Sequence, residues 1–254
     1  MPSVMWDMRG LVVAVAGGTR GIGLGIAEAF ATAGAAVWLG GRDAATGEAA
    51  AGQLRTSGKP ARFHRLDVAD RASVRAFRDA CLREAGRIDV WVNNAAAMAR
   101  KPLLDTSEAE CDRMLAVNVK GVILGCQAAG EAMIGAGGGR IINISATSSS
   151  IPARNAAIYG LTKAAVSQLT RMLALEWAPH AIRVNAIAPG PVPTNLNADI
   201  LDDPKQREAI LARIPLGRLG TPADVGAVAL FLASPAAEYL TGQVIFVDGG
   251  RTVA

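Results

Sequence analysis

A short apolar segment that runs into a glycine-rich loop and then into helical sequence constrains the fold of this chain more than any other feature. Residues 11–16 are typical of a buried strand, and the loop Gly17 to Gly23 follows with the spacing G-x-x-x-G-x-G. The Ala-rich residues 24–33 predict a helix that begins at this loop. Glycines let backbone N–H groups approach a phosphate, and a helix N-terminus adds partial positive charge. The segment therefore predicts a βα unit that can bind the pyrophosphate of a dinucleotide.

Strand-like and helix-like segments alternate along the rest of the chain. The further runs that we expect to form strands are residues 36–40, 61–66, 87–92, 139–144, 182–188 and 243–247. Such alternation indicates right-handed βαβ units, and a core rich in Ala, Val, Ile and Leu suits a parallel sheet covered on both faces. We therefore expect residues 1–254 to form one α/β domain, with a doubly wound sheet of about seven parallel strands and helices on both faces. Residues 195–215, which are less regular and which Pro204 interrupts, are the predicted substrate lid.

Composition excludes several classes of function. The net charge of +4 is modest and the basic residues are dispersed, which disfavours a nucleic-acid partner. No apolar stretch approaches the ~20 residues of a membrane span, and the first nine residues lack the apolar run of a signal peptide. The cysteines and histidines show neither disulfide nor metal-site spacing: Cys81, Cys111, Cys126, His64 and His180. We expect a cytoplasmic protein with reduced thiols and no metal or membrane partner.

Tyr159 and Lys163 are the first candidate catalytic residues. They lie four positions apart in a segment that predicts a helix, so both side chains lie on one face. A phenol has a reference pKa near 10, and a nearby ammonium is expected to lower it toward neutrality. The pair predicts a proton donor and acceptor for interconverting a carbonyl and an alcohol. Taken alone, the same pair is also compatible with two neighbours on a solvated helix face.

The end of the second expected strand indicates which nicotinamide nucleotide the chain prefers. An NAD site has an acidic residue about 20 positions beyond the glycine loop, and Gly41 stands there instead. Arg42 follows, and Arg20 of the loop is expected to converge on the same place. Two guanidinium groups suit a 2′-phosphate, so we expect NADP(H) rather than NAD(H). In the alternative, Asp43 is the ribose-binding acid or the N-cap of the next helix.

The motifs together resemble the short-chain dehydrogenase/reductases, in particular the compact single-domain branch that includes 3-oxoacyl-carrier-protein reductases. The resemblance extends from Val12 to Gly250 and implies a Rossmann-type fold. The motifs that carry it are Gly17-x-x-x-Gly21-Ile22-Gly23, Asp67-Val68, Asn93-Asn94-Ala95, Asn118, Tyr159-x-x-x-Lys163, Pro189-Gly190 with Thr194, and Val247-Asp248-Gly249-Gly250.

The resemblance implies roles for individual residues. Tyr159 would be the general acid/base, Lys163 would bind the nicotinamide ribose, and Asn118 would hold a water in a proton relay, although a buried asparagine satisfied by backbone is the alternative. Asp67 and Val68 would contact the adenine, Asn94 the adenosine side, and Val192 and Thr194 the carboxamide. The complete set expected to bind the cofactor is Gly17, Thr19, Arg20, Gly21, Ile22, Gly23, Arg42, Asp67, Val68, Asn94, Tyr159, Lys163, Pro189, Gly190, Val192 and Thr194.

Three positions depart from the family pattern: Ala16, Ala96 and Ala146. The third is the important one, because the family's catalytic serine stands thirteen positions before the tyrosine, where this chain has Ala146. If the backbone stays extended past Ala146, Ser148 projects to the same side two residues later. We therefore expect Ser148 to supply the missing hydroxyl, with Thr147 as the second candidate.

The predicted function is NADP(H)-dependent hydride transfer between the nicotinamide and a small-molecule carbonyl or secondary alcohol. The alternative is a cofactor-binding relative with weak or lost catalysis that acts as a redox sensor or assembly partner, which only Ala146 favours. Arg100, Lys101 and Arg154 flank the expected cleft, where they could meet an anionic or carrier-protein-linked substrate. The resemblance also implies a homodimer or a homotetramer.

Overall fold

The structure is a computed structural model that describes residues 6–56 and 58–254. Its seven strands form one parallel sheet in the order β3-β2-β1-β4-β5-β6-β7. The strands are β1 (Val12–Ala16), β2 (Ala36–Gly41), β3 (Ala61–Arg65), β4 (Val90–Asn93), β5 (Gly139–Ile144), β6 (Ile182–Pro189) and β7 (Val244–Val247). The parallel, doubly wound sheet predicted from the sequence is confirmed, and only the boundaries differ, most at β4, which begins later than expected.

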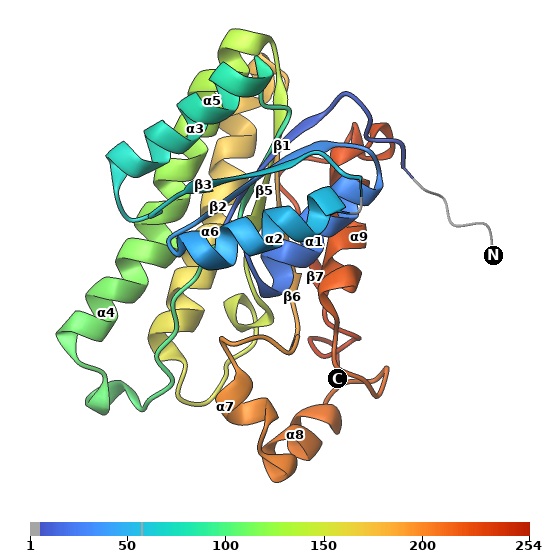
Figure 1. The fold of residues 1–254 in the computed structure, drawn as a ribbon. Helices are drawn as coiled ribbons and strands as arrows, with labels where there is room; N and C mark the ends of the chain where they lie inside the picture. The colour runs from blue at the N-terminus through green and yellow to red at the C-terminus, as the bar shows by residue number, and fades with distance from the viewer. Residues whose placement is uncertain (1–5, 57) are drawn as a thin grey trace.

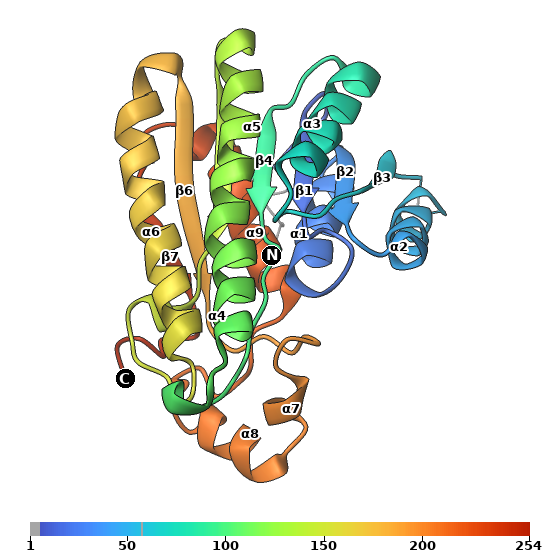
Figure 2. The ribbon, with the colours of Figure 1, turned by 90° about the vertical axis from the view of Figure 1, so that its left-hand side faces the viewer.

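Helices cover both faces of the sheet (Figures 1 and 2). On one face of the sheet, two helices, α1 and α9, pack against each other, and a third, α2, lies beside α1. The helices on that face are α1 (Gly21–Thr32), α2 (Ala44–Thr56) and α9 (Pro222–Ala233). The helices on the other face are α3 (Arg71–Ala85), α4 (Glu108–Leu115), α5 (Gly121–Ala136) and α6 (Ala157–Trp177).

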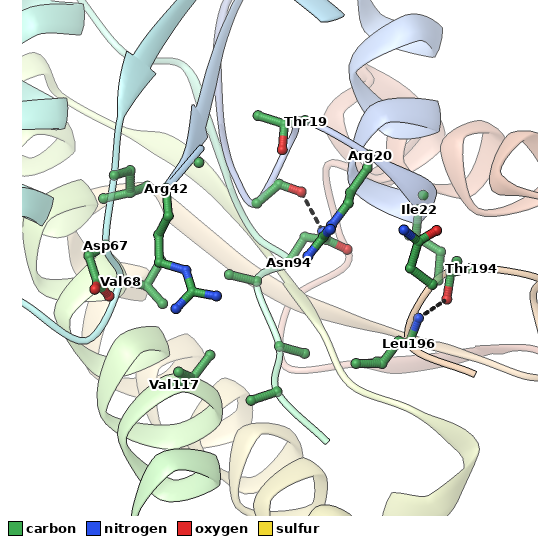
Figure 3. A pocket seen from close by; sticks show the side chains of 18 of the residues that line it. Thr19, Arg20, Ile22, Arg42, Asp67, Val68, Asn94, Val117, Thr194 and Leu196 are labelled. Atoms are coloured by element: carbon green, nitrogen blue, oxygen red, sulfur yellow. Dashed lines mark hydrogen bonds between the residues drawn. The ribbon is translucent and has the colours of Figure 1, made fainter. Parts of the chain in front are cut away.

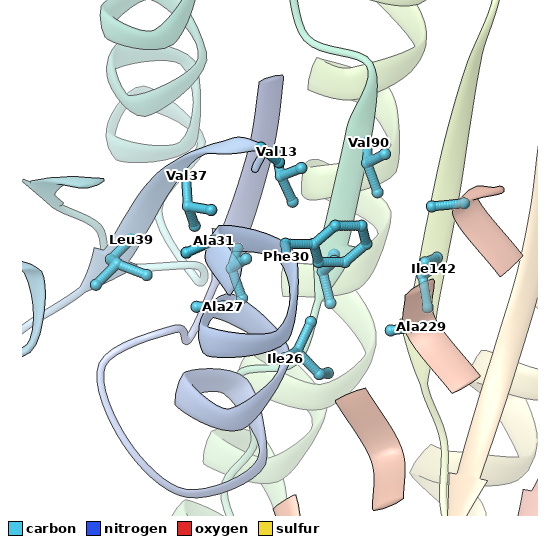
Figure 4. Packing of buried hydrophobic residues seen from close by; sticks show 14 of the residues in the cluster. Val13, Ile26, Ala27, Phe30, Ala31, Val37, Leu39, Val90, Ile142 and Ala229 are labelled. Carbon is cyan, nitrogen blue, oxygen red and sulfur yellow. The ribbon is translucent and has the colours of Figure 1, made fainter. Parts of the chain in front are cut away.

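Alternating residues of the strands divide the core into two layers. Val13 and Val15 pack toward Phe30 and the α1 side, as Figure 4 shows for Val13, whereas Val12 and Ala14 belong to the cluster under α3, α5 and α6. Successive side chains of a strand point to opposite faces, so a strand buried on both sides is apolar at nearly every position. This explains why β1 is buried along its whole length.

The shorter elements lie between the strands and the longer helices. They include the 3₁₀ turns η1 (Leu103–Asp105), η3 (Thr147–Ser149), η4 (Ala178–His180) and η5 (Pro235–Ala237), the π-helical turn η2 (Ala116–Lys120) between α4 and α5, and the helices α7 (Ala198–Leu201) and α8 (Pro204–Leu211). The expectation of an irregular lid at residues 195–215 was wrong about Pro204. Asp203 caps α8 by accepting from the amides of Lys205 and Gln206, and Pro204 is the first residue of that helix rather than an interruption.

None of the helices in the described ranges is both long and apolar enough to cross a bilayer.

Candidate active site

The glycine loop, the ends of β2 and β3 and the start of α1 surround a pocket of about 250 Å³ (Figure 3). We call it the nucleotide pocket. Its lining includes the expected residues Gly17, Thr19, Arg20, Gly21, Ile22, Arg42, Asp67, Val68, Asn94 and Thr194. It also includes Arg113 and Val117, which the sequence did not indicate, and Leu196 of the predicted lid. Ten residues of the expected cofactor set therefore lie around one pocket at the carboxyl edge of the sheet.

Two glycines are required where backbones approach closely. A Cβ at Gly23 would lie 2.0 Å from the carbonyl oxygen of Gly17, and one at Gly17, whose φ is +85°, would lie 2.6 Å from the amide nitrogen of Ala95. The Asn94 side chain donates to the Gly17 carbonyl at 2.7 Å and so ties the end of β4 to the loop. At this strand–loop–helix junction the backbones therefore lie too close together for a side chain at either glycine.

Arg20 and Arg42 come from different loops, and both guanidinium groups extend into the nucleotide pocket (Figure 3). Both side chains are exposed. Asp43 does not line this pocket. Its carboxylate accepts from the Thr46 amide at 2.7 Å, which caps α2, and that bond, together with the charge of Arg20, lowers its pKa. Of the two roles considered for Asp43, the structure places it as a helix N-cap.

A second pocket, of about 180 Å³, continues from the first past Ile22, Asn94 and Thr194. We call it the substrate pocket. It is lined by both members of the predicted catalytic pair, by the residues around Ala146, and by Pro189, Gly190, Val192 and Thr194. Of the expected cofactor and catalytic residues, Gly23 and Asn118 line neither pocket. The others meet at the two joined pockets although they come from distant parts of the chain.

Tyr159 and Lys163 stand one turn apart on α6, with the Lys163 Nζ 5.7 Å from the centroid of the tyrosine ring. The Nζ donates to the carbonyl oxygen of Ile144, the last residue of β5, at 2.8 Å. Burial lowers the pKa of Lys163 to about 8. Burial also raises the pKa of Tyr159 to about 12, while the charge of Arg100 acts in the opposite direction. Burial therefore dominates, and the net pKa of Tyr159 lies above its ordinary value rather than below it, as we had expected from the nearby Lys163.

The expectation of an extended backbone beyond Ala146 was also wrong. Ala146 itself is extended, but the chain turns at once into η3. Even so, Ser148 lines the substrate pocket, and its Oγ is buried with no hydrogen-bond partner among the residues that the structure describes. Two nearby serine hydroxyls are engaged: that of Ser145 donates to the Lys163 carbonyl at 3.0 Å, and that of Ser149 donates to the Ala146 carbonyl at 2.7 Å. Thr147, the second candidate, lines the pocket as well.

Asn118 lies in the π-helical turn and is fully buried. Its Oδ1 accepts from the Ala97 amide at 2.7 Å, and its Nδ2 donates to the Ala97 carbonyl at 2.8 Å and to the Thr162 Oγ1 at 3.1 Å. The Thr162 hydroxyl donates in turn to the Tyr159 carbonyl at 2.7 Å. All hydrogen bonds of the Asn118 side chain are thus made within the protein, and they connect it to the first turn of α6. This agrees with the alternative that Asn118 is a buried asparagine with satisfied hydrogen bonds.

A buried polar network, which the sequence did not indicate, lies under the middle of α6. Asn93 accepts from the Trp91 indole at 2.8 Å and donates to the Asn143 Oδ1 at 2.9 Å, while Asn143 donates to the Thr170 Oγ1 at 3.0 Å. The network joins β4 and β5 to α6 and fixes the helix that carries Tyr159. Asparagines at the ends of two apolar strands were the available signal.

Two further residues were missed. Asn197 binds the loop after β6, because its Oδ1 accepts from the Thr194 amide at 2.9 Å and its Nδ2 donates to the Val192 carbonyl at 2.9 Å. Arg251 reaches the substrate pocket from the C-terminal segment. Of the basic residues expected to flank the cleft, only Arg100 lines it. Lys101 pairs with Glu110 at 2.6 Å, and Arg154 lies outside the pocket on the surface.

Comparisons with known proteins agree with this geometry. A family model described as Enoyl-(Acyl carrier protein) reductase matches residues 16–252. D-threitol dehydrogenase of Mycolicibacterium smegmatis is 39% identical over 99% of this chain and 97% of its own length. Galactitol 2-dehydrogenase (L-tagatose-forming) of Cereibacter sphaeroides is 40% identical over 98% of each chain. A crystal structure of gluconate 5-dehydrogenase from Burkholderia cenocepacia, in complex with NADP and tartrate, superposes with a TM-score of 0.94 at 36% identity, covering 98% of this chain and 99% of that one.

Proposed function

The chain belongs to the short-chain dehydrogenase/reductase family, and from this premise we propose that it is an NADP(H)-dependent dehydrogenase or reductase of a small alcohol or ketone. Its class as an oxidoreductase follows from the relatives, which are dehydrogenases over essentially the full length of the chain. They give no support to the alternative of a member that serves as a redox sensor or assembly partner.

The residues of the nucleotide pocket suit NADP(H). The glycine loop and the N-terminus of α1 would hold the pyrophosphate, Asp67 and Val68 the adenine, and the loop from Pro189 to Thr194 the nicotinamide end. Arg20 and Arg42 supply positive charge where a 2′-phosphate would lie, and Asp43, the acid that would favour NAD(H), is engaged as a helix cap. The bound nucleotide supplies the hydride acceptor or donor.

Tyr159 handles the proton at its Oη. A phenol whose pKa lies at about 12 stays protonated at neutral pH and can donate to the oxygen of a ketone as that oxygen gains negative charge. In the reverse direction the phenolate takes the hydroxyl proton of the alcohol, a state that positive charge nearby favours. Lys163 and Arg100 supply this charge, since Lys163 lies one turn away and the charge of Arg100 already lowers the phenol pKa.

Ser148 is the hydroxyl that we assign to the role of the family serine. Burying a hydroxyl without a hydrogen-bond partner is unfavourable. A substrate oxygen that accepts a hydrogen bond from Ser148 would remove this unfavourable free energy. Such a donor, aimed at the oxygen where charge develops, contributes ~10²–10³ in rate. For Asn118 we propose a positioning role through Thr162 and, if it holds a water, through its main-chain carbonyl, because its side chain is fully engaged.

We also expect a homodimer or homotetramer in the cytoplasm. Leu161, Met172 and Leu175 lie exposed on one face of α6, and Ile123 and Ile134 on one face of α5. A second copy of the chain would cover these apolar side chains. The cysteines are unpaired, as suits a reducing compartment. We expect residues 1–254 to act as one domain and residues 195–215 to close over the substrate.

One observation carries the proposal: the Tyr159–Lys163 pair lies in a pocket that adjoins the glycine-loop pocket. The test is to measure NADPH and NADH binding by fluorescence and then to follow NADPH oxidation with a panel of ketones and NADP⁺ reduction with polyols. We expect tighter binding of NADPH and turnover of at least one polyol or its ketone. Binding without turnover across the panel would favour a non-catalytic member.

A further inference from the structure

The C-terminal segment brings an arginine into the substrate pocket. Asp248, directly after β7, accepts from the amides of Gly250 at 3.0 Å and Thr252 at 2.8 Å, and both of its carboxylate oxygens are used in this way. The turn that results packs on the segment after α8, because a Cβ at Gly250 would lie 3.0 Å from the ring of Pro215. The backbone of Arg251 is therefore held in place, and its side chain lines the pocket that contains Tyr159.

The charge of this pocket is entirely positive within the part of the chain that the structure describes. Arg100, Lys163 and Arg251 line it, and no Asp or Glu does. Lys163 faces the site of proton transfer and donates to a backbone carbonyl, so the two arginines remain as the charges that can meet a substrate's functional groups. The remaining lining is largely small and apolar, including Ala153, Ala156 and Pro191.

The Arg251 guanidinium is half-buried without a salt bridge to any described residue. Burial lowers its pKa, the charges of Arg213 and Arg100 lower it further, and only Asp248 acts against them. A charge in such surroundings costs free energy unless a counter-charge and hydrogen bonds compensate it. An anion in the pocket would supply both, and a planar carboxylate matches the parallel N–H groups of a guanidinium.

The position of Arg100 relates this charge to the reacting atoms. Its charge reaches the Tyr159 phenol, whose pKa it lowers, and it also reaches Arg251. Both arginines line the same pocket as Tyr159, so a small molecule bound there can contact the phenol at one end and the guanidinium groups at the other. The pocket has a volume of about 180 Å³, which suits a small molecule.

We propose that the natural substrate is a short hydroxy acid, or the oxo acid formed from it, whose carboxylate is bound by Arg251 together with Arg100. In the oxidative direction the C–H bond of the carbinol carbon breaks and gives a hydride to NADP⁺, and the hydroxyl proton passes to the Tyr159 phenolate. The carboxylate is unchanged. This inference rests on the proposed function and specifies its substrate class.

The test compares substrates that differ only in the anionic group. An aldonate, the polyol of the same carbon number and the phosphate monoester of that polyol are assayed with NADP⁺. We expect kcat/KM to be at least tenfold higher for the aldonate than for either of the others. Arg251→Met should lower the value for the aldonate about 10- to 100-fold and reduce the ratio of the aldonate value to the polyol value at least tenfold. Arg251→Lys should recover part of the loss, and Arg154→Met, which removes a surface arginine outside the pocket, should change nothing.

A binding measurement makes the result independent of turnover. Calorimetric titration of the NADP⁺ complex with malonate should show binding that Arg251→Met weakens at least tenfold, whereas the neutral malonamide should not bind; circular dichroism verifies that the variant is folded. A preference for the polyol or the phosphate ester, or malonate binding that does not depend on Arg251, would overturn the inference alone. Failure to bind any nicotinamide nucleotide would overturn the proposed function and this inference with it.

Discussion

Replacing Arg42 by Ala tests the origin of cofactor choice. The guanidinium extends into the nucleotide pocket from the end of β2 and is exposed (Figure 3). A hydrogen bond between a guanidinium and a phosphate contributes about 1.5–3 kcal/mol, and solvent screening at an exposed site favours the lower end of that range. We therefore expect a loss of about 1.5 kcal/mol, which is roughly a tenfold weaker Kd for NADPH.

The assay is a fluorescence titration with NADPH and with NADH at two salt concentrations. Only the NADPH affinity should fall, because NADH lacks the 2′-phosphate, and the difference between the two nucleotides should shrink at higher salt. Arg20→Ala should act in the same direction, since this residue precedes α1 without a side-chain capping bond. Arg83→Ala, on the surface of α3, is the matched control. Equal losses for both nucleotides, or a wild-type preference for NADH, would refute the reasoning.

Two further predictions concern the chemistry. Ser148→Ala should lower kcat ~10²–10³-fold with little change in NADPH affinity. The control Ser150→Ala, at an exposed position, should have no effect. Unchanged turnover of Ser148→Ala would show that Ser148 has no part in the mechanism. Ketone reduction should be independent of pH below about 8 and fall above it, because Lys163 loses its charge there while Tyr159 stays protonated. The Lys163→Arg variant should react more slowly, but its rate should not fall above pH 8, because a guanidinium does not titrate in this range. If the rate of this variant still falls, the transition belongs to another group.

The order of elements could be predicted from the sequence because strands buried on both faces leave a plain pattern. The continuous apolar run of β1 and the glycines after it specify a buried strand and a phosphate loop with no knowledge of the rest of the fold. Strand ends of a parallel sheet lie at one edge, so residues as distant as Asp67 and Thr194 could be expected at a common pocket, and they are found there.

Local geometry beyond the strand ends could not be predicted in this way. The turn of η3 after Ala146 depends on contacts with α6, so the assumption of an extended chain was wrong even though Ser148 does line the substrate pocket. The phenol pKa depends on how far the fold buries Tyr159, which the spacing to Lys163 does not reveal. The position of Arg251 in the substrate pocket could not be predicted from the sequence, because only tertiary packing brings the segment after β7 to this pocket.

The most direct test of the account is a single variant, Tyr159→Phe, measured twice. NADPH binding should stay within about threefold of the wild-type value, because the ring and the Lys163 contact to the Ile144 carbonyl are kept. Turnover of the best ketone should fall by ~10²–10⁴, the range expected for removing a positioned general acid. Turnover within tenfold of the wild-type rate, with NADPH bound as tightly as before, would contradict the claim that this phenol transfers the proton.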